Sequence, residues 1–439
     1  MTGPTTAALL LSTGLIGWAL LMRLATGTWL QPAAFFPLWW CVAGIAPLVL
    51  APNEPVGTNA IVWLMAASIV VSAGAIAGNG GLRTRKLAKP QPATDRELKI
   101  FGAVLIVSVI LGTISNIAYL TGSGIPLTEV LDIERLVVVS NQLYVARYAE
   151  TGLVAPPAIS QALLPFVYLA PAVGGMLFVL RREWTWKLLC LFSFVPAITV
   201  TILQTTKAAV LFSLVLFLSG YFATRLRFGK MTVFTVPHLA VAGVLTAVVT
   251  VFFFAIGLAR MASTDVSLLN IVLVKLVTAA FGHMTVFSQW LAEYTSQPLS
   301  PSLGKVTFAG PLEMLGYQQR IPGIFSNVID LIAGESSNIY TAFRPLIQDF
   351  SIPGALVVLA LLGFAGGLGF RKVAAGHWSA VPLLIGTYHT IMWSPITWFW
   401  IYNSLTATVV AIGALAWLIR FWRGSGRVAF SRRRPWRYS

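Results

Sequence analysis

Charged residues and cysteines are scarce in this sequence. Only 10% of the 439 residues are charged, whereas soluble globular proteins average about 25%, which excludes a soluble enzyme and a disordered chain. The two cysteines, Cys41 and Cys190, lie in apolar stretches, which excludes a disulfide framework and a cysteine-based zinc site. A P-loop, a dinucleotide-binding glycine fingerprint and an Asp-x-Asp cluster for Mg²⁺ are also lacking. We therefore expect neither a metal nor another cofactor.

The sequence contains many long apolar runs. Hydrophobic residues make up 57% of the chain, and eleven continuous runs reach the length of about 17–25 residues that crosses a bilayer as a helix. These runs cover 5–22, 33–50, 59–77, 99–119, 159–180, 188–204, 208–224, 233–258, 352–370, 379–396 and 399–419. The sequence predicts an all-α polytopic membrane protein, with one membrane domain over 1–439 and about eleven transmembrane helices.

A twelfth crossing is the alternative, because the stretch from Leu268 to Tyr294 is also apolar. It contains Lys275, Gly282 and His283, and a crossing there would move every later loop to the other side of the membrane. We interpret it instead as an interfacial or re-entrant helical pair within a long external segment.

The basic residues are distributed unevenly among the loops. One set of alternate loops holds 22 of the 30 basic residues and three of the 14 acidic residues. By the positive-inside rule this set is cytoplasmic, so the N-terminus is outside and the C-terminus is inside. The external loops are then about 121–157 and 259–351, and the basic tail 420–439 lies against anionic membrane lipid. The net charge of +16 therefore predicts a lipid partner and no nucleic acid.

Two features of the predicted spans bear on function. Their interiors hold almost no Asp, Glu, Lys or Arg. Ion-coupled transporters place such groups at the bilayer midplane, so this scarcity argues against a transporter. Glycines recur in the span that contains Gly363–Phe370, and small residues of this kind permit close helix contact.

External cations are the candidates for binding an anionic substrate. Arg344 enters a span in a segment with several polar residues, and a guanidinium fork binds phosphate through two parallel hydrogen bonds. Arg344 could instead pair with Asp349 or extend to the interface. The other candidates are Lys207, Arg260, Arg320, Arg135 and Arg147. Asp132 can satisfy Arg135 locally, and Glu150 can satisfy Arg147, each at i,i+3 spacing.

The candidate proton acceptors are less well defined. Asp330 and Glu335 are the external acids nearest to Arg344 along the chain on its N-terminal side, while His283 titrates near neutrality when unperturbed. A single histidine in an apolar stretch is more commonly a packed residue, and the same holds for His389 in a predicted span.

The segment Ser336–Gly354, SSNIYTAFRPLIQDFSIPG, contains a recognisable motif. It resembles the signature of the Wzy-type oligosaccharide repeat-unit polymerases, or O-antigen polymerases: Asn338, Tyr340-Thr341, Phe343-Arg344 and the turn Asp349-Phe350-Ser351. Ser351 departs from this pattern, which has glycine at that position. The eleven-span layout and the long external loop before the last spans are also similar to that family.

The resemblance implies a GT-C-like membrane glycosyltransferase. It would transfer a growing glycan from undecaprenyl pyrophosphate to a lipid-linked repeat unit, on the outer face of the bacterial cytoplasmic membrane, with a chain-length regulator as a possible partner. Asn338, Tyr340 and Arg344 would then bind substrate. An O-antigen ligase is the alternative enzyme, and a polysaccharide flippase or other transporter is the alternative from another class.

Overall fold

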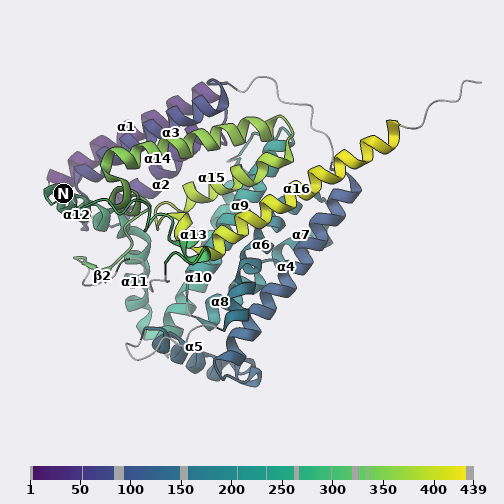
Figure 1. The fold of residues 1–439 in the computed structure, drawn as a ribbon. Coiled ribbons are helices and arrows are strands. Elements are labelled where there is room, and N and C mark those ends of the chain that lie inside the picture. Colours follow the sequence, from purple (N-terminus) through teal and green to yellow (C-terminus); the bar gives the residue numbers. More distant parts are fainter. Residues whose placement is uncertain are drawn as a thin grey trace, which may run out of the picture.

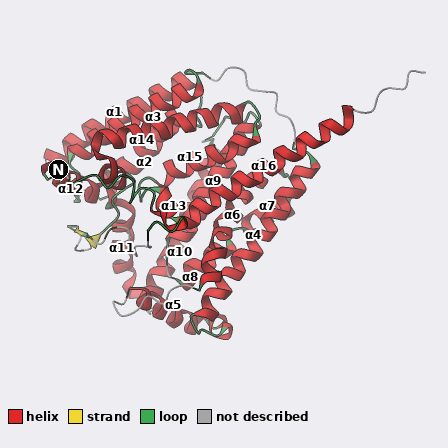
Figure 2. Ribbon diagram, viewed as in Figure 1, coloured by secondary structure: helices red, strands yellow, loops and turns green. Residues whose placement is uncertain are grey.

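The chain folds almost entirely into helices (Figures 1 and 2). The computed structural model describes residues 3–51, 53–83, 93–148, 157–204, 206–233, 235–261, 266–297, 299–318, 325, 327–332, 334 and 336–431. The α-helices are α1 Gly3–Thr26, α2 Pro32–Leu50, α3 Thr58–Asn79, α4 Asp95–Gly122, α5 Ile133–Tyr148, α6 Ala158–Leu180, α7 Trp184–Phe192, α8 Val195–Leu203, α9 Ala208–Arg227, α10 Val236–Arg260, α11 Leu269–Phe281, α12 His283–Ser296, α13 Ala309–Met314, α14 Phe343–Ala374, α15 Val381–Trp393 and α16 Asn403–Ser431. The 3₁₀ helices are η1 Leu127–Leu131, η2 Val266–Leu268, η3 Trp378–Ala380 and η4 Phe399–Ile401, and two short strands, β1 Ile329–Asp330 and β2 Ser336–Ser337, pair antiparallel.

The described residues form nine helices that are long and apolar enough to cross a membrane, or ten if the bent pair α11–α12 is one span. This confirms the prediction of an all-α polytopic membrane protein. The helical pair expected around Gly282 is present, and its two halves are bent by 53°. The predicted loop 121–157 contains η1 and α5, and the helix of α16 continues into the predicted basic tail as far as Ser431. Residues 432–439 lie outside the described part.

The predicted span 379–396 is not a membrane-length helix. The helix there, α15, has 13 residues, which gives about 20 Å at 1.5 Å per residue against a hydrocarbon core of about 30 Å. Every residue of α15 except Leu383 is buried. A helix that is apolar on all sides is typical of a protein core, so the apolarity of this stretch reflects burial among other helices rather than contact with lipid.

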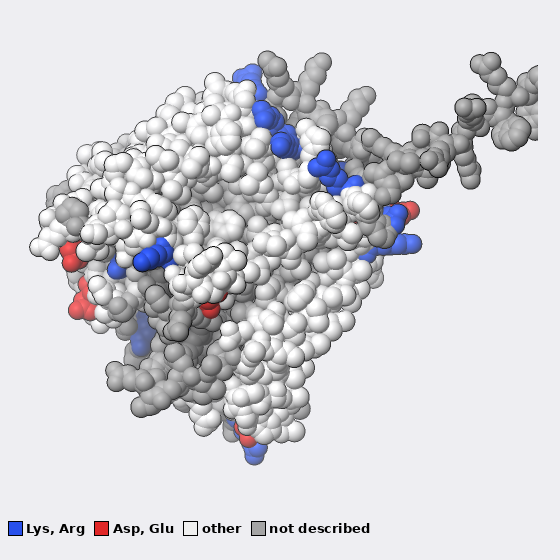
Figure 3. Space-filling model, in the orientation of Figure 1, with Lys and Arg blue, Asp and Glu red and all other residues white. Residues whose placement is uncertain are grey.

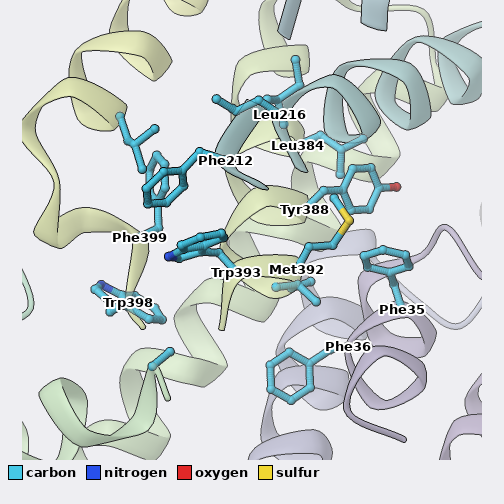
Figure 4. Close-up of a cluster of buried hydrophobic side chains, with 14 of the residues drawn as sticks. Phe35, Phe36, Phe212, Leu216, Leu384, Tyr388, Met392, Trp393, Trp398 and Phe399 are labelled. Carbon is cyan, nitrogen blue, oxygen red and sulfur yellow. The ribbon is translucent and has the colours of Figure 1, made fainter. Parts of the chain in front are cut away.

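Aromatic side chains pack around α15 (Figure 4). Tyr388 lies edge-on to Phe35 of α2, with ring centroids 5.2 Å apart. The ring of Trp393, the last residue of α15, packs against Phe212 of α9, with the two ring centroids 3.9 Å apart. His389 is fully buried beside Phe399 of η4, in agreement with the packing role expected for it. These contacts fix α15 between α2 and α9.

Glycines allow α3 and α14 to pack backbone to backbone. A Cβ atom on Gly74 or Gly78 of α3 would overlap a backbone carbonyl oxygen of α14, and one on Gly363 or Gly367 of α14 would overlap a carbonyl oxygen of α3. Side chains at these positions would push the helices apart. The close helix contact predicted from the glycines of 363–370 is thus confirmed.

Lys and Arg gather at one end of the molecule, along the upper right edge of Figure 3. We call this the basic end; the C-terminal ends of α3, α6, α9 and α14 lie there (Figure 1). The basic residues at these ends and in the turns that follow them include Arg83, Arg181, Arg182, Lys187, Arg225, Arg227, Lys230, Arg371 and Lys372. The opposite end carries α5, α12 and the β1–β2 pair (Figure 1). The charge segregation read from the loops is therefore present in the fold.

Candidate functional site

The motif segment is bounded by two strained backbone positions. Thr341 and Ser351 have φ values of 65° and 62°, in the left-handed region that non-glycine residues rarely adopt. Ser351 interrupts α14, so the residues from Phe343 to Phe350 form a short helical piece at an angle to the rest of α14. The backbone N–H of Ala342 donates to the carbonyl of Ser394 at 2.7 Å. Arg344 is thus held on a short helix fixed at both of its ends.

We expect Ser351→Gly to stabilise the protein. The φ of 62° and ψ of 175° at Ser351 belong to a region that is nearly exclusive to glycine and costs other residues about 1–3 kcal/mol. Glycine loses more backbone entropy on folding, by about 0.5–1 kcal/mol, so the net gain should be about 1 kcal/mol. In detergent, the melting temperature should rise by about 1–2 °C. Ser351→Ala is the control, because it removes the hydroxyl but keeps the Cβ; an equal rise in both variants would contradict the backbone explanation.

The guanidinium of Arg344 lies in an aromatic enclosure. Its Cζ is 3.8 Å from the ring centroid of Tyr340, 3.9 Å from that of Phe325 and 5.5 Å from that of Trp290. The residue is only 7% exposed, and its Nε and Nη1 are buried without a hydrogen-bond partner in the described part of the chain. Cation–π contacts stabilise the charge, but they leave the hydrogen-bonding capacity of these nitrogens unused.

Asp349 does not neutralise Arg344, so the pairing considered from the sequence is wrong. Its fully buried carboxylate accepts hydrogen bonds from the hydroxyl of Ser302 and from the backbone N–H groups of Val306 (3.1 Å) and Thr307 (2.5 Å). Asp349 therefore anchors the turn at 302–307 beside α14. Arg344 forms no ion pair within the described ranges.

Asn338 and Tyr340 position the aromatic wall around Arg344. The Asn338 side-chain amide donates to the carbonyl of Phe325 at 3.2 Å, and the Tyr340 hydroxyl donates to the carbonyl of Asn327 at 2.9 Å. The rings of Phe325 and Tyr340 meet edge-on, with centroids 5.3 Å apart. The pairing of β1 with β2 brings the segments before and after this turn together. Both residues thus hold Phe325 against the guanidinium, while the side chain of Asn338 is itself exposed.

The proposed proton acceptors lie in different surroundings. Asp330 is exposed on β1, opposite Ser336. His283 is buried at the start of α12, where Nδ1 is 3.1 Å from the carbonyl oxygen of Ala280 and Nε2 is 3.1 Å from that of Ala43. Both ring nitrogens thus face backbone acceptors. Glu335 lies outside the described residues.

Lys207 and Arg260 form a second cationic group. Lys207 precedes α9, and its Nζ lies 5.7 Å from the ring centroid of Phe253 on α10. Burial, followed by the nearby charge of Arg260, lowers the pKa of Lys207 from 10.5 to about 8, because both effects disfavour the ammonium form. Asn141 of α5 donates to the carbonyl of Arg260 at 2.8 Å.

Arg135 is the one remaining cation candidate whose side chain the structure describes. The side chain of Arg135 is 69% exposed and lies 3.9 Å from the Asp132 carboxylate, which confirms the predicted i,i+3 pair. Arg320 and the side chain of Arg147 lie outside the described residues. Within the described ranges, no group of three or more His, Cys, Asp or Glu residues could hold a metal ion.

The sequence interpretation missed the contributions of Trp290 and Phe325. A signal for Trp290 exists, because Phe287, Trp290 and Tyr294 recur at i, i+3 and i+7 and stack along one face of α12. Phe325 has no comparable signal, since its place depends on the hydrogen bonds made by Asn338 and Tyr340.

Comparison of the chain with protein-family models, with curated proteins and with solved structures finds no match. The fold and the Arg344 enclosure therefore have to be interpreted from their own chemistry.

Proposed function

We propose that this protein is a membrane glycosyltransferase that polymerises oligosaccharide repeat units linked to undecaprenyl pyrophosphate. The reaction takes place on the outer face of the bacterial cytoplasmic membrane, at the end of the molecule opposite the basic end. The observation that carries this proposal is the buried Arg344, with two nitrogens that lack hydrogen-bond partners among the described residues. It lies in the segment Ser336–Gly354, which resembles the signature of the Wzy-type polymerases.

The geometry around Arg344 suits an anionic substrate. Burying a cation is costly unless it is paired, and the surrounding rings compensate only part of that cost. A pyrophosphate oxygen offers the charge-assisted hydrogen bonds that Nε and Nη1 lack. A lipid pyrophosphate would present this group at the start of a membrane helix, where α14 carries Arg344.

The proposed reaction needs a cation for the leaving group and a base for the acceptor hydroxyl. As the glycosidic bond to pyrophosphate breaks, negative charge grows on the departing phosphate, and a fixed guanidinium stabilises that charge. A carboxylate takes the proton of the acceptor sugar hydroxyl. Asp330, which is exposed, and Glu335 are the candidates for this role. His283 is less suited, because its two nitrogens face backbone carbonyls.

The proposed activity is tested by analysing the surface glycan of a bacterial strain from which the gene has been deleted. We expect lipid-linked or surface-attached material that carries a single repeat unit, because assembly and flipping continue while polymerisation stops. Gel electrophoresis of the glycan measures this, and complementation with the intact gene is the control. Free lipid-linked polymer would indicate a ligase instead, and the absence of glycan on the outer face would indicate a flippase.

The proposed orientation places the N-terminus outside and the basic end in the cytoplasm. We expect alkaline phosphatase to be active when fused within 300–340 and inactive when fused after Arg427, because the enzyme folds only after export. A fluorescent protein that folds in the cytoplasm, fused at the same positions, is the control and should give the opposite pattern. Active phosphatase after Arg427 would reverse the orientation.

A further inference from the structure

A cavity of about 210 Å³ opens at the basic end. It lies where α6 ends, α7 begins and α9 ends. It is lined by Phe178, Val179, Arg181, Arg182, Lys187, Tyr221, Arg225 and Lys230. Five of these eight residues are basic and none is acidic, so positive charge is concentrated around the cavity.

Three of the five basic side chains, those of Arg181, Lys187 and Arg225, are held in place by their neighbours. Arg225 donates to the Tyr221 hydroxyl at 2.7 Å and to the carbonyl of Thr232 at 2.8 Å. The Cζ of Arg181 lies 4.8 Å from the ring centroid of Trp186, and Lys187 Nζ lies 5.4 Å from that of Phe178. These contacts fix the cations near one another, against their mutual repulsion, before any ligand arrives.

The charge of the cavity is only partly compensated. Glu183 lies 3.7 Å from one terminal nitrogen of Arg181. The Nε of the same guanidinium is buried and has no hydrogen-bond partner among the described residues. A fixed group of cations with unused donor capacity favours an anion with several acceptor oxygens.

We propose that this cavity binds a phosphate group, either in the head of an anionic lipid or in a soluble phosphate compound. Its volume is below the roughly 300–1,000 Å³ of typical small-molecule sites, which suits a phosphate-bearing head rather than a nucleotide. Basic pockets between transmembrane helices at the cytoplasmic side are suited to phosphate-bearing lipid heads. Positive charge spread along loops would satisfy the positive-inside rule without converging on one cavity, so the gathering of five basic residues around this cavity points to a ligand. This proposal is independent of the glycosyltransferase function.

The test compares two double variants of the full-length protein in detergent. Arg182→Gln/Lys187→Gln removes two cations from the cavity, while Arg371→Gln/Lys372→Gln removes two exposed cations of the same end that do not line it. Binding of dioleoyl phosphatidylglycerol is followed by native mass spectrometry, and binding of inorganic pyrophosphate by calorimetry. Each lost cation should weaken binding about fivefold, so the cavity variant should bind about 25-fold more weakly and the control should stay near wild type.

The two probes distinguish the source of the phosphate. Selective loss of phosphatidylglycerol binding identifies a lipid head, and selective loss of pyrophosphate binding identifies a soluble compound; either result supports the site. Equal losses in both double variants, or no loss in the cavity variant with either probe, would overturn it. Folding is checked for each variant by its melting temperature, and the more conservative Lys187→Gln alone replaces the double variant if that temperature falls.

Discussion

Replacing Arg344 by lysine is expected to lower the rate of glycan polymerisation by about 10²- to 10³-fold, although the positive charge is retained. Lysine lacks the planar fork that donates two parallel hydrogen bonds to a phosphate. It also cannot stack between Tyr340 and Phe325, whose ring centroids lie 3.8 and 3.9 Å from the Arg344 Cζ. The rate is measured with purified protein and a lipid-pyrophosphate-linked repeat unit, by the appearance of polymer on a gel.

Arg371→Lys is the matched control for this experiment. Arg371 lies on the same helix, α14, but at the basic end, where it is exposed, so its replacement should leave the rate unchanged. Arg344→Ala should be at least as impaired as Arg344→Lys, because it removes the charge as well as the fork. Normal polymerisation by a folded and correctly inserted Arg344→Ala protein would rule out the proposed role.

The sequence predicted most of the membrane helices because each is specified locally. A run such as 59–77 is apolar over its whole length, and no distant residue is needed to recognise it as a helix of membrane length. Hydropathy does not report what surrounds a helix, however. The run 379–396 is as apolar as its neighbours, yet α15 is only 13 residues long and is buried among α2, α9 and η4.

The candidate site was predicted less completely because its parts come from distant segments. Arg344 was identifiable from the motif and from its place before a span. The partner of Asp349 was not, because Thr307 lies 42 residues away along the chain. Trp290 reaches Arg344 through the packing of α12, and Phe325 through side-chain hydrogen bonds. Sequence spacing gives no information about contacts of this kind.

The backbone conformation of Ser351 connects the sequence motif to the fold. The sequence marks Asp349-Phe350-Ser351 as a turn in which serine replaces the glycine of the pattern that the segment resembles. The structure shows this turn, since the backbone at Ser351 has a φ of 62°, in the left-handed region that favours glycine. The short helix that carries Arg344 is thereby set at an angle to the rest of α14, and its orientation relative to α12 depends on that turn.

Gly367→Ala is expected to destabilise the protein more than the replacement of any other glycine in α14 by alanine. The new Cβ would overlap the carbonyl oxygen of Ala75 on α3, and neither backbone can move without separating the two helices. Overpacking of this kind costs about 1–3 kcal/mol and occasionally more, and we expect the upper part of that range because the clash is with backbone. The melting temperature in detergent should fall by about 5 °C.

Gly17→Ala on α1 separates the clash from the general effect of replacing glycine in a helix. A Cβ at Gly17 would meet no atom within 4 Å, and alanine is favoured over glycine in a helix by about 0.8–1.0 kcal/mol. Gly17→Ala should therefore raise the melting temperature slightly, so the two substitutions should have opposite signs. If Gly367→Ala were also stabilising, α3 and α14 could not be in backbone contact, and the packing that supports the Arg344 end of α14 would have to be different.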